Sequence, residues 1–116
     1  MISTGQQRYA LLSAVTSGIS TYIPGANFND LTVYVQGTGT TSGGTIAVEE
    51  AEWDVLNGGT MPAGAWSQIT TIAASGLSGG QQAFHLPRGS YGAVRVNITG
   101  AITGGGTVTI TARGIC

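Results

Sequence analysis

Four of the five acidic residues of this 116-residue chain stand close together, at Glu49, Glu50, Glu52 and Asp54. Successive side chains of an extended strand point to opposite faces, so Glu50, Glu52 and Asp54 would share one face. Carboxylates grouped in this way bind a divalent cation, contact a basic patch on a partner, or supply the acid pair of a glycoside hydrolase. The alternative without a binding role is a solvent-exposed strand face.

The metal and catalytic alternatives need more than this run provides. Calcium takes about six to eight oxygen ligands from a looped segment, whereas carboxylates on a straight strand lie about 6.6 Å apart at every second residue. A glycosidase also needs a substrate cleft, which a domain of this size seldom builds. We therefore expect a partner contact through Glu50, Glu52 and Asp54 as the functional alternative to a solvated face.

Other residues of catalytic type lack the partners that chemistry requires. The segment 76–80 has the letters of a serine-nucleophile motif, but every acid precedes it and no strand–turn–helix pattern surrounds it. His85 is the one histidine and Cys116 the one cysteine, which leaves neither a His/Cys metal set nor an intrachain disulfide within these residues. We expect no catalytic residue, no metal and no cofactor, and hence no enzymatic activity.

Trp53 and Trp66 leave two interpretations open. Exposed, coplanar indole rings would form a stacking platform for sugars and make the chain a carbohydrate- or receptor-binding module. Buried rings would instead be anchors of the core or of an interface.

The elements that must position these residues are short strands. Glycine contributes 20 residues and separates runs rich in Val, Ile and Thr, and no segment has a sustained helical period. Clear strands are predicted over 31–36, 45–48, 93–98 and 107–111, and weaker ones over 9–15, 20–23, 66–73 and 81–86. This spacing predicts an all-β antiparallel sandwich of jelly-roll or Greek-key topology, as a single domain over residues 1–116.

Two longer patterns bear on topology. Residues 33–48 and 94–110 each consist of a strand, a glycine-rich loop and a second strand, which predicts two similar hairpins packed face to face. The spacing from Leu86 to Tyr91 matches a tyrosine corner, which marks a Greek-key crossover.

Charge is scarce along the whole chain. It has four arginines, no lysine and a net charge of -1, with 8% charged residues, which opposes direct binding to nucleic acid. The sequence begins without the basic start and apolar run of a signal peptide, and no stretch approaches the ~20 apolar residues of a membrane span. We therefore expect a soluble protein made in a cytoplasm, with no membrane partner.

Uncharged sheet edges favour assembly. Natural edges are commonly guarded by charges, above all by lysine, and edges left uncharged are usually covered. We therefore expect a homo-oligomer, a protein docked on a larger surface, or both. Residues 1–19, with Tyr9 and Leu11, form either an ordinary first strand or an N-terminal arm that reaches a neighbour, and in the second case Tyr9 and Leu11 join the partner interface.

The run 85–96, His-Leu-Pro-Arg-Gly-Ser-Tyr-Gly-Ala-Val-Arg-Val, leads into a Thr/Gly-rich loop and a Thr-Val-Thr-Ile strand. This pattern resembles small β-sandwich structural proteins of tailed bacteriophages over about residues 31–113. The resemblance implies a virion protein of the capsid decoration (cement) type, often a trimer on the capsid surface. Its partner would be the major capsid protein or another virion protein. The alternative is a carbohydrate- or receptor-binding module of a phage fibre or tail. The family brings no catalytic residues.

Overall fold

The computed structural model describes residues 6–24, 30–51, 66–77, 79–86 and 93–115. These residues form strands separated by short turns, with one 3-10 turn, η4 (Ala74–Gly76). The strands are β1 (Gln6–Val15), β2 (Gly18–Ile19), β3 (Ile23–Pro24), β4 (Asp30–Thr38), β5 (Gly43–Ala51), β6 (Ser67–Ala73), β7 (Gln81–Leu86), β8 (Ala93–Thr103) and β9 (Thr107–Ile115). None of the described segments is a helix long and apolar enough to cross a bilayer.

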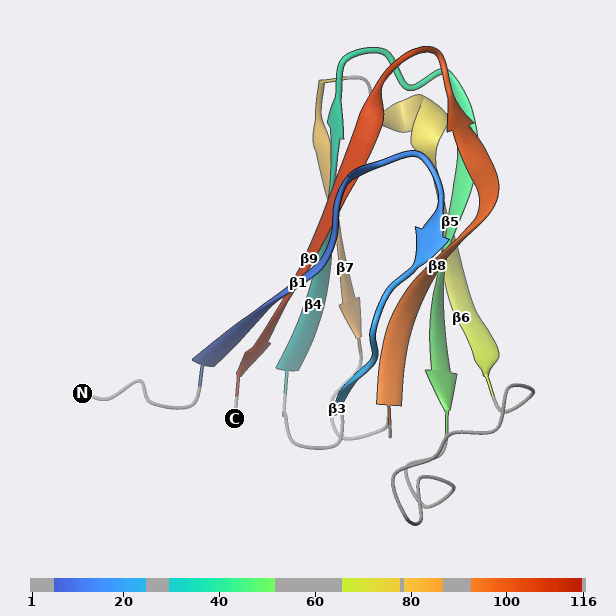
Figure 1. The fold of residues 1–116 in the computed structure, drawn as a ribbon. Helices are drawn as coiled ribbons and strands as arrows, with labels where there is room; N and C mark the ends of the chain where they lie inside the picture. Colours follow the sequence, from blue (N-terminus) through green and yellow to red (C-terminus); the bar gives the residue numbers. More distant parts are fainter. Residues whose placement is uncertain (1–5, 25–29, 52–65, 78, 87–92, 116) are drawn as a thin grey trace.

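The strands build two antiparallel sheets that pack face to face (Figure 1). Sheet A has the order β1-β9-β4-β7, and sheet B has the order β2-β8-β5-β6, with β3 also pairing with β8. Strands β2 and β3 thus act as one interrupted strand. Counting β2 and β3 as one strand gives eight strands in chain order. In that numbering the order in sheet A is 1-8-3-6, and the order in sheet B is 2-7-4-5. This is jelly-roll order, and it confirms the predicted β-sandwich.

The core lies between the sheets and follows the alternation of each strand. Val33 and Val35 of β4 are fully buried, as their spacing predicts. The alternate residues of β5, β8 and β9 meet them from both sheets: Ile46, Val48, Val94, Val96, Val108 and Ile110. Because the sandwich is two layers thick, each strand needs only one apolar face, and Val-, Ile- and Thr-rich alternation supplies it.

The prediction of two hairpins is wrong. Strand β4 lies in sheet A and β5 in sheet B, and β8 and β9 are likewise divided between the sheets. The two repeated segments instead pair with each other, because β4 pairs with β9 and β5 pairs with β8. A strand–loop–strand pattern marks where strands begin and end, but it contains no signal for the sheet that the second strand joins.

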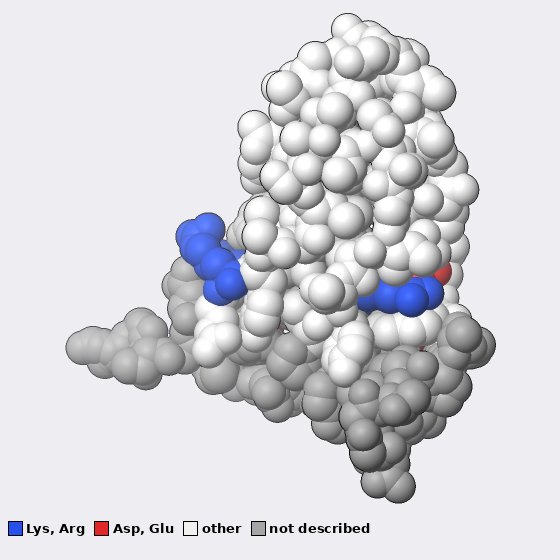
Figure 2. Space-filling view, in the orientation of Figure 1, with Lys and Arg blue, Asp and Glu red and all other residues white. Residues whose placement is uncertain are grey.

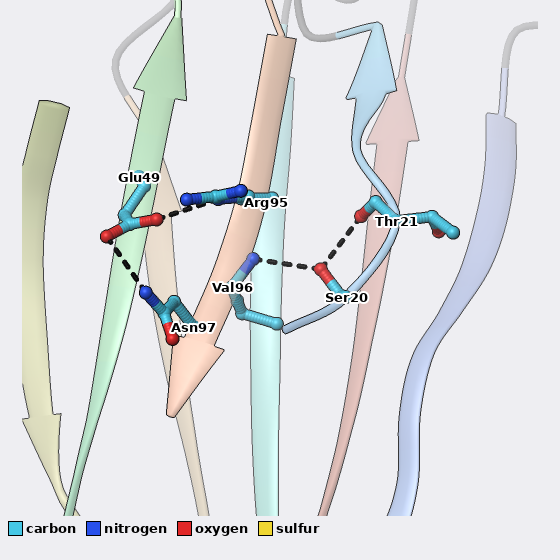
Figure 3. Close-up of polar contacts among 6 residues, drawn as sticks. All are labelled: Ser20, Thr21, Glu49, Arg95, Val96 and Asn97. Carbon is cyan, nitrogen blue, oxygen red and sulfur yellow. Dashed lines mark hydrogen bonds and ion pairs between the residues drawn. The ribbon is translucent and has the colours of Figure 1, made fainter. Parts of the chain in front are cut away.

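The predicted strand over 20–23 is interrupted. Only Gly18–Ile19 and Ile23–Pro24 pair regularly with β8. Ser20 lies between them and bonds to Val96 outside the regular ladder. Its backbone N donates to the Val96 carbonyl at 2.9 Å. Its Oγ accepts from the Val96 backbone N at 3.0 Å (Figure 3). The predicted tyrosine corner, Leu86 to Tyr91, lies outside the described residues except for Leu86, which ends β7.

Turns at the end of the sandwich opposite the chain termini are tied to one another. The Thr41 hydroxyl, fully buried, donates to the Ala74 carbonyl at 2.8 Å, and the Gly106 N donates to the Thr40 carbonyl at 2.8 Å. These bonds satisfy backbone groups that the turns would otherwise leave unpaired. The view in Figure 2 shows neither acidic nor basic side chains at this upper end. The charged residues of the described chain lie toward the other end, at Arg8, Asp30, Glu49, Glu50, Arg95 and Arg113.

Candidate partner-binding face

The outward face of sheet B carries an ion pair between its two central strands. Glu49 of β5 lies directly opposite Arg95 of β8. The pairs on either side are Ala47 with Asn97 and Ala51 with Ala93, and the three alanines are buried although they point away from the core. Small residues therefore surround the charged pair.

Both carboxylate oxygens of Glu49 have partners (Figure 3). The Arg95 Nε donates to Glu49 Oε1 at 2.7 Å, and the Asn97 Nδ2 donates to Glu49 Oε2 at 3.3 Å. The Arg95 and Glu49 side chains are only 20% and 13% exposed. Reduced contact with water strengthens such a charge-assisted hydrogen bond and fixes the direction of the guanidinium.

Trp66 brings an aromatic ring to the same guanidinium. The Arg95 Cζ lies 4.3 Å from the centroid of the Trp66 ring, in cation–π geometry. The ring of Tyr22, from the segment between β2 and β3, also lies near Trp66, with its centroid 6.2 Å from that of Trp66 at an interplanar angle of 47°. We call Tyr22, Glu49, Trp66, Arg95 and Asn97 the Trp66–Arg95 cluster.

This composition suits protein contact better than sugar stacking. Trp, Tyr and Arg are the residue types that dominate binding energy in protein interfaces. The rings of Tyr22 and Trp66 are tilted relative to each other rather than coplanar, and the Arg95 guanidinium already lies against the Trp66 ring. Trp53, the other residue named for a stacking platform, lies outside the described residues.

The acids expected at a partner interface are placed only in part. Glu50 is half-buried and lies opposite Val94, on the face of β5 that also carries Ile46 and Val48. Glu52 and Asp54 lie outside the described residues. Sequence reasoning missed Glu49 as a site residue, because nothing in the sequence of either strand shows that Arg95 is its cross-strand neighbour.

Tyr9 and Leu11, the other residues named for a partner contact, lie on β1. Leu11 is buried in the core, and Tyr9 packs against the core while its hydroxyl donates to Gln7 Oε1 at 3.0 Å. Residues 6–15 thus pair with β9 of the same chain as a first strand. A contact of residues 1–19 with a neighbouring chain stays a prediction.

Residues of catalytic type do not converge in the part of the chain that the structure describes. His85 lies on β7 with its Nδ1 2.8 Å from the Thr32 hydroxyl. Ser78 lies outside the described residues, and the buried Leu77 beside it belongs to the core. Among the described residues no group of three or more His, Cys, Asp or Glu side chains could hold a metal ion.

Comparison with known proteins finds likeness in structure only. No family model and no curated protein matches the sequence. Among solved structures, the SPBc2 prophage-derived protein YomS has a TM-score of 0.63 and 14% identity, over 100% of this chain and 98% of that chain. The PBSX exported protein XepA has a TM-score of 0.66 and 15% identity, over 100% of this chain and 39% of that chain. The Triatoma virus capsid has a TM-score of 0.52 and 7% identity, over 97% and 68%. At such identities the likeness shows a shared fold.

Proposed function

We propose that this protein is a non-enzymatic structural component of a phage virion, and specifically a capsid decoration protein that binds between major capsid subunits. The observation that carries the proposal is the full-length likeness to a prophage-derived protein, in which nearly the whole of both chains corresponds. The fold alone does not assign a role. The outward Trp66–Arg95 cluster supplies the contact surface that such a role requires.

The physical mechanism is stabilisation of one assembly state. A protein that binds the assembled shell but not its separate subunits shifts the equilibrium toward the shell by mass action. Each contact can be weak when several act together, because the first contact raises the effective concentration of the others. A homotrimer at the junction of capsid subunits would have three such contacts.

The Trp66–Arg95 cluster is the contact we assign to this docking. Glu49, itself bonded by Asn97, holds the guanidinium beside Trp66 before any partner arrives, so little side-chain freedom remains to be lost on binding. Tyr22 lies beside Trp66, is 40% exposed and offers further aromatic area for a contact. A pre-ordered aromatic and arginine surface of this kind fits a protein partner, with the major capsid protein or another virion protein as occupant.

The test is the copy number of this chain relative to the major capsid protein in purified particles of the phage that encodes it, measured by quantitative mass spectrometry. Stoichiometric abundance would support a decoration protein, and particles lacking it should then lose their DNA at a lower temperature. A handful of copies per particle would favour the alternative role as a receptor-binding module of a tail or fibre. Complete absence would overturn the proposal.

The contact surface has its own test. Particles lacking the chain are incubated with purified wild-type protein, with Trp66→Ala, and with Thr99→Ala, which changes an exposed residue of β8 outside the cluster. We expect Trp66→Ala to rebind at least about tenfold more weakly, as for an interface hot spot. Thr99→Ala should rebind like the wild type. Equal rebinding of all three proteins would exclude the cluster as the docking surface.

A further inference from the structure

The opposite face of the sandwich carries a row of polar side chains across all four strands of sheet A. Arg8 of β1 pairs with Arg113 of β9, Arg113 pairs with Thr32 of β4, and Thr32 pairs with His85 of β7. Their neighbours along each strand, such as Val33 and Ala112, face the core, so these four side chains point outward. We call Arg8, Arg113, Thr32 and His85 the arginine row.

The two arginines of this row are cross-strand neighbours of like charge. Like charges placed directly opposite each other destabilise a sheet. Neither guanidinium has an ion pair among the described residues, in contrast to Arg95 with Glu49. Asp30 lies on the same face, opposite Ile115, which places it two residues along β4 from Thr32. Asp30 forms no ion pair with Arg8 or Arg113. The described part of this face is therefore net positive.

Arg113 is also incompletely satisfied. Its Nε is buried without a hydrogen-bond partner, although its Cζ lies 5.8 Å from the centroid of the Tyr34 ring. Buried donors in native proteins nearly always have partners, and one without a partner requires an explanation. The Tyr34 ring lies within cation–π distance of the guanidinium while the Nε donor remains unused, and a planar anion is the kind of ligand that a guanidinium binds.

Carboxylates of a protein are the anions that this row fits best. A guanidinium binds a carboxylate through two parallel hydrogen bonds, and two adjacent guanidinium groups suit a segment with neighbouring acidic side chains. Tight binding of nucleic acid draws on many phosphate contacts, whereas the chain has four arginines, no lysine and a net charge of -1. His85 is exposed and extends the row as a further polar contact, while its Nδ1 is held 2.8 Å from the buried Thr32 hydroxyl.

We propose that the arginine row binds an acidic segment of a protein partner through its carboxylates. The identity of that partner as a virion protein rests on the function proposed above, but the site itself does not. With the Trp66–Arg95 cluster on sheet B, the row gives the sandwich contacts on both outward faces. With one contact on each of two opposite faces, a single molecule can bind one subunit on either side and so join two neighbouring subunits.

The test uses the nitrogen-15-labelled full chain and the side-chain Nε–Hε signals of its arginines. The sequence has four arginines, so at most four signals need assignment, by single Arg→Gln variants. Hexaglutamate peptide is titrated at low salt, with inorganic phosphate and a single-stranded oligothymidine as separate titrants. The Arg8 and Arg113 signals should shift and saturate with the peptide. The Arg95 signal should stay in place, because its Nε already donates to Glu49.

Variants make the site assignment specific. Arg113→Gln should weaken peptide binding about tenfold, since each hydrogen bond to a charged group contributes roughly a factor of ten or more. Arg8→Gln, an exposed change, should also weaken binding and serves if Arg113→Gln fails to fold. Thr99→Ala, an exposed change on β8 outside both surfaces, is the control and should bind the peptide like the wild type.

Four results would overturn the proposal: no saturable shift, equal shifts of all arginines, equal affinity for phosphate and peptide, or preference for the oligothymidine. None of them bears on the abundance of the chain in virions. Conversely, absence from virions would remove the proposed function and leave the peptide site standing, so failure of each proposal is recognised separately.

Discussion

Arg95 stacks on Trp66, with its Cζ 4.3 Å from the centroid of the indole ring, although Arg95 lies on β8 and Trp66 directly precedes β6, on the other side of β5. The register explains how they meet. Ser67 pairs with Glu50 and Arg95 pairs with the adjacent Glu49, so Trp66, which directly precedes Ser67, starts close to Arg95 along the sheet, and its ring reaches across β5. The outward face of sheet B is therefore ordered by contacts that cross a whole strand.

A double-mutant cycle should detect this contact in the free energy of unfolding. We expect Trp66→Leu and Arg95→Met to show a coupling of about 0.5–2 kcal/mol, the range of cation–π pairs, in urea denaturation. Gln82→Ala, exposed on β7 of the other sheet, combined with Arg95→Met is the control and should be additive within about 0.5 kcal/mol. Additivity of the Trp66 pair would mean that the stacking does not stabilise the fold.

Gly106 should tolerate no larger residue. A Cβ at this position would lie 2.7 Å from the Thr40 carbonyl oxygen and closer still to that of Thr38, and both atoms belong to backbone that cannot swing away. Gly106→Ala should lower the free energy of unfolding by about 1–3 kcal/mol or more, as overpacked sites do.

Gly76→Ala is the matched control, because a Cβ there has no neighbour within 4 Å. It should unfold within about 1 kcal/mol of the wild type, and a more rigid unfolded chain could make it slightly more stable. Thermal unfolding followed by circular dichroism compares the two variants. Equal melting temperatures would show that the turn after β8 adjusts freely.

Leu77 should be a large contributor to stability even though it lies outside the strands. Its side chain is 1% exposed and closes the core beside η4. Leu77→Ala should cost about 2–5 kcal/mol in chemical denaturation, from lost burial and the cavity left behind. Ile19→Ala changes a side chain that is 55% exposed and should stay within about 0.5 kcal/mol. A small effect at Leu77 would mean that the core collapses around the gap.

Strand β7 is the sheet edge that we expect to pair with another chain. The edge strand β1 has two register shifts, β6 has one, and β2 and β3 have two residues each, features that discourage further pairing. By contrast, β7 pairs with β4 in unbroken register and carries no acid, arginine or proline.

Ala83→Lys should therefore lower the molar mass of the predicted oligomer, as measured by light scattering after size exclusion. A lysine at an exposed edge position opposes the approach of another strand. Thr99→Lys places the same charge on β8, which has neighbours on both sides, and should leave the mass unchanged. A wild-type chain that stays monomeric at all concentrations would contradict this prediction.

Strands and core were readable from the sequence, because both depend on local patterns. Alternation placed Val33 and Val35 in the core, and runs of Val, Ile and Thr between glycines located strands close to their observed bounds. Burying one face of each strand is the dominant requirement of a two-layer sandwich, so a period of two residues suffices to find that face.

Which strand lies beside which was decided only by the tertiary structure. The sequence suggested that the strands of segment 33–48 pair with each other, yet β4 joins β9 and β5 joins β8. Neither outward surface could be predicted for the same reason, because each depends on strand pairing. Glu49 meets Arg95 only where β5 pairs with β8, and Arg8 meets Arg113 only where β1 pairs with β9. Hydrogen bonds between strands are formed by the backbone and are nearly indifferent to side-chain type. Pairing therefore follows from how the whole chain closes its core, which no local pattern records.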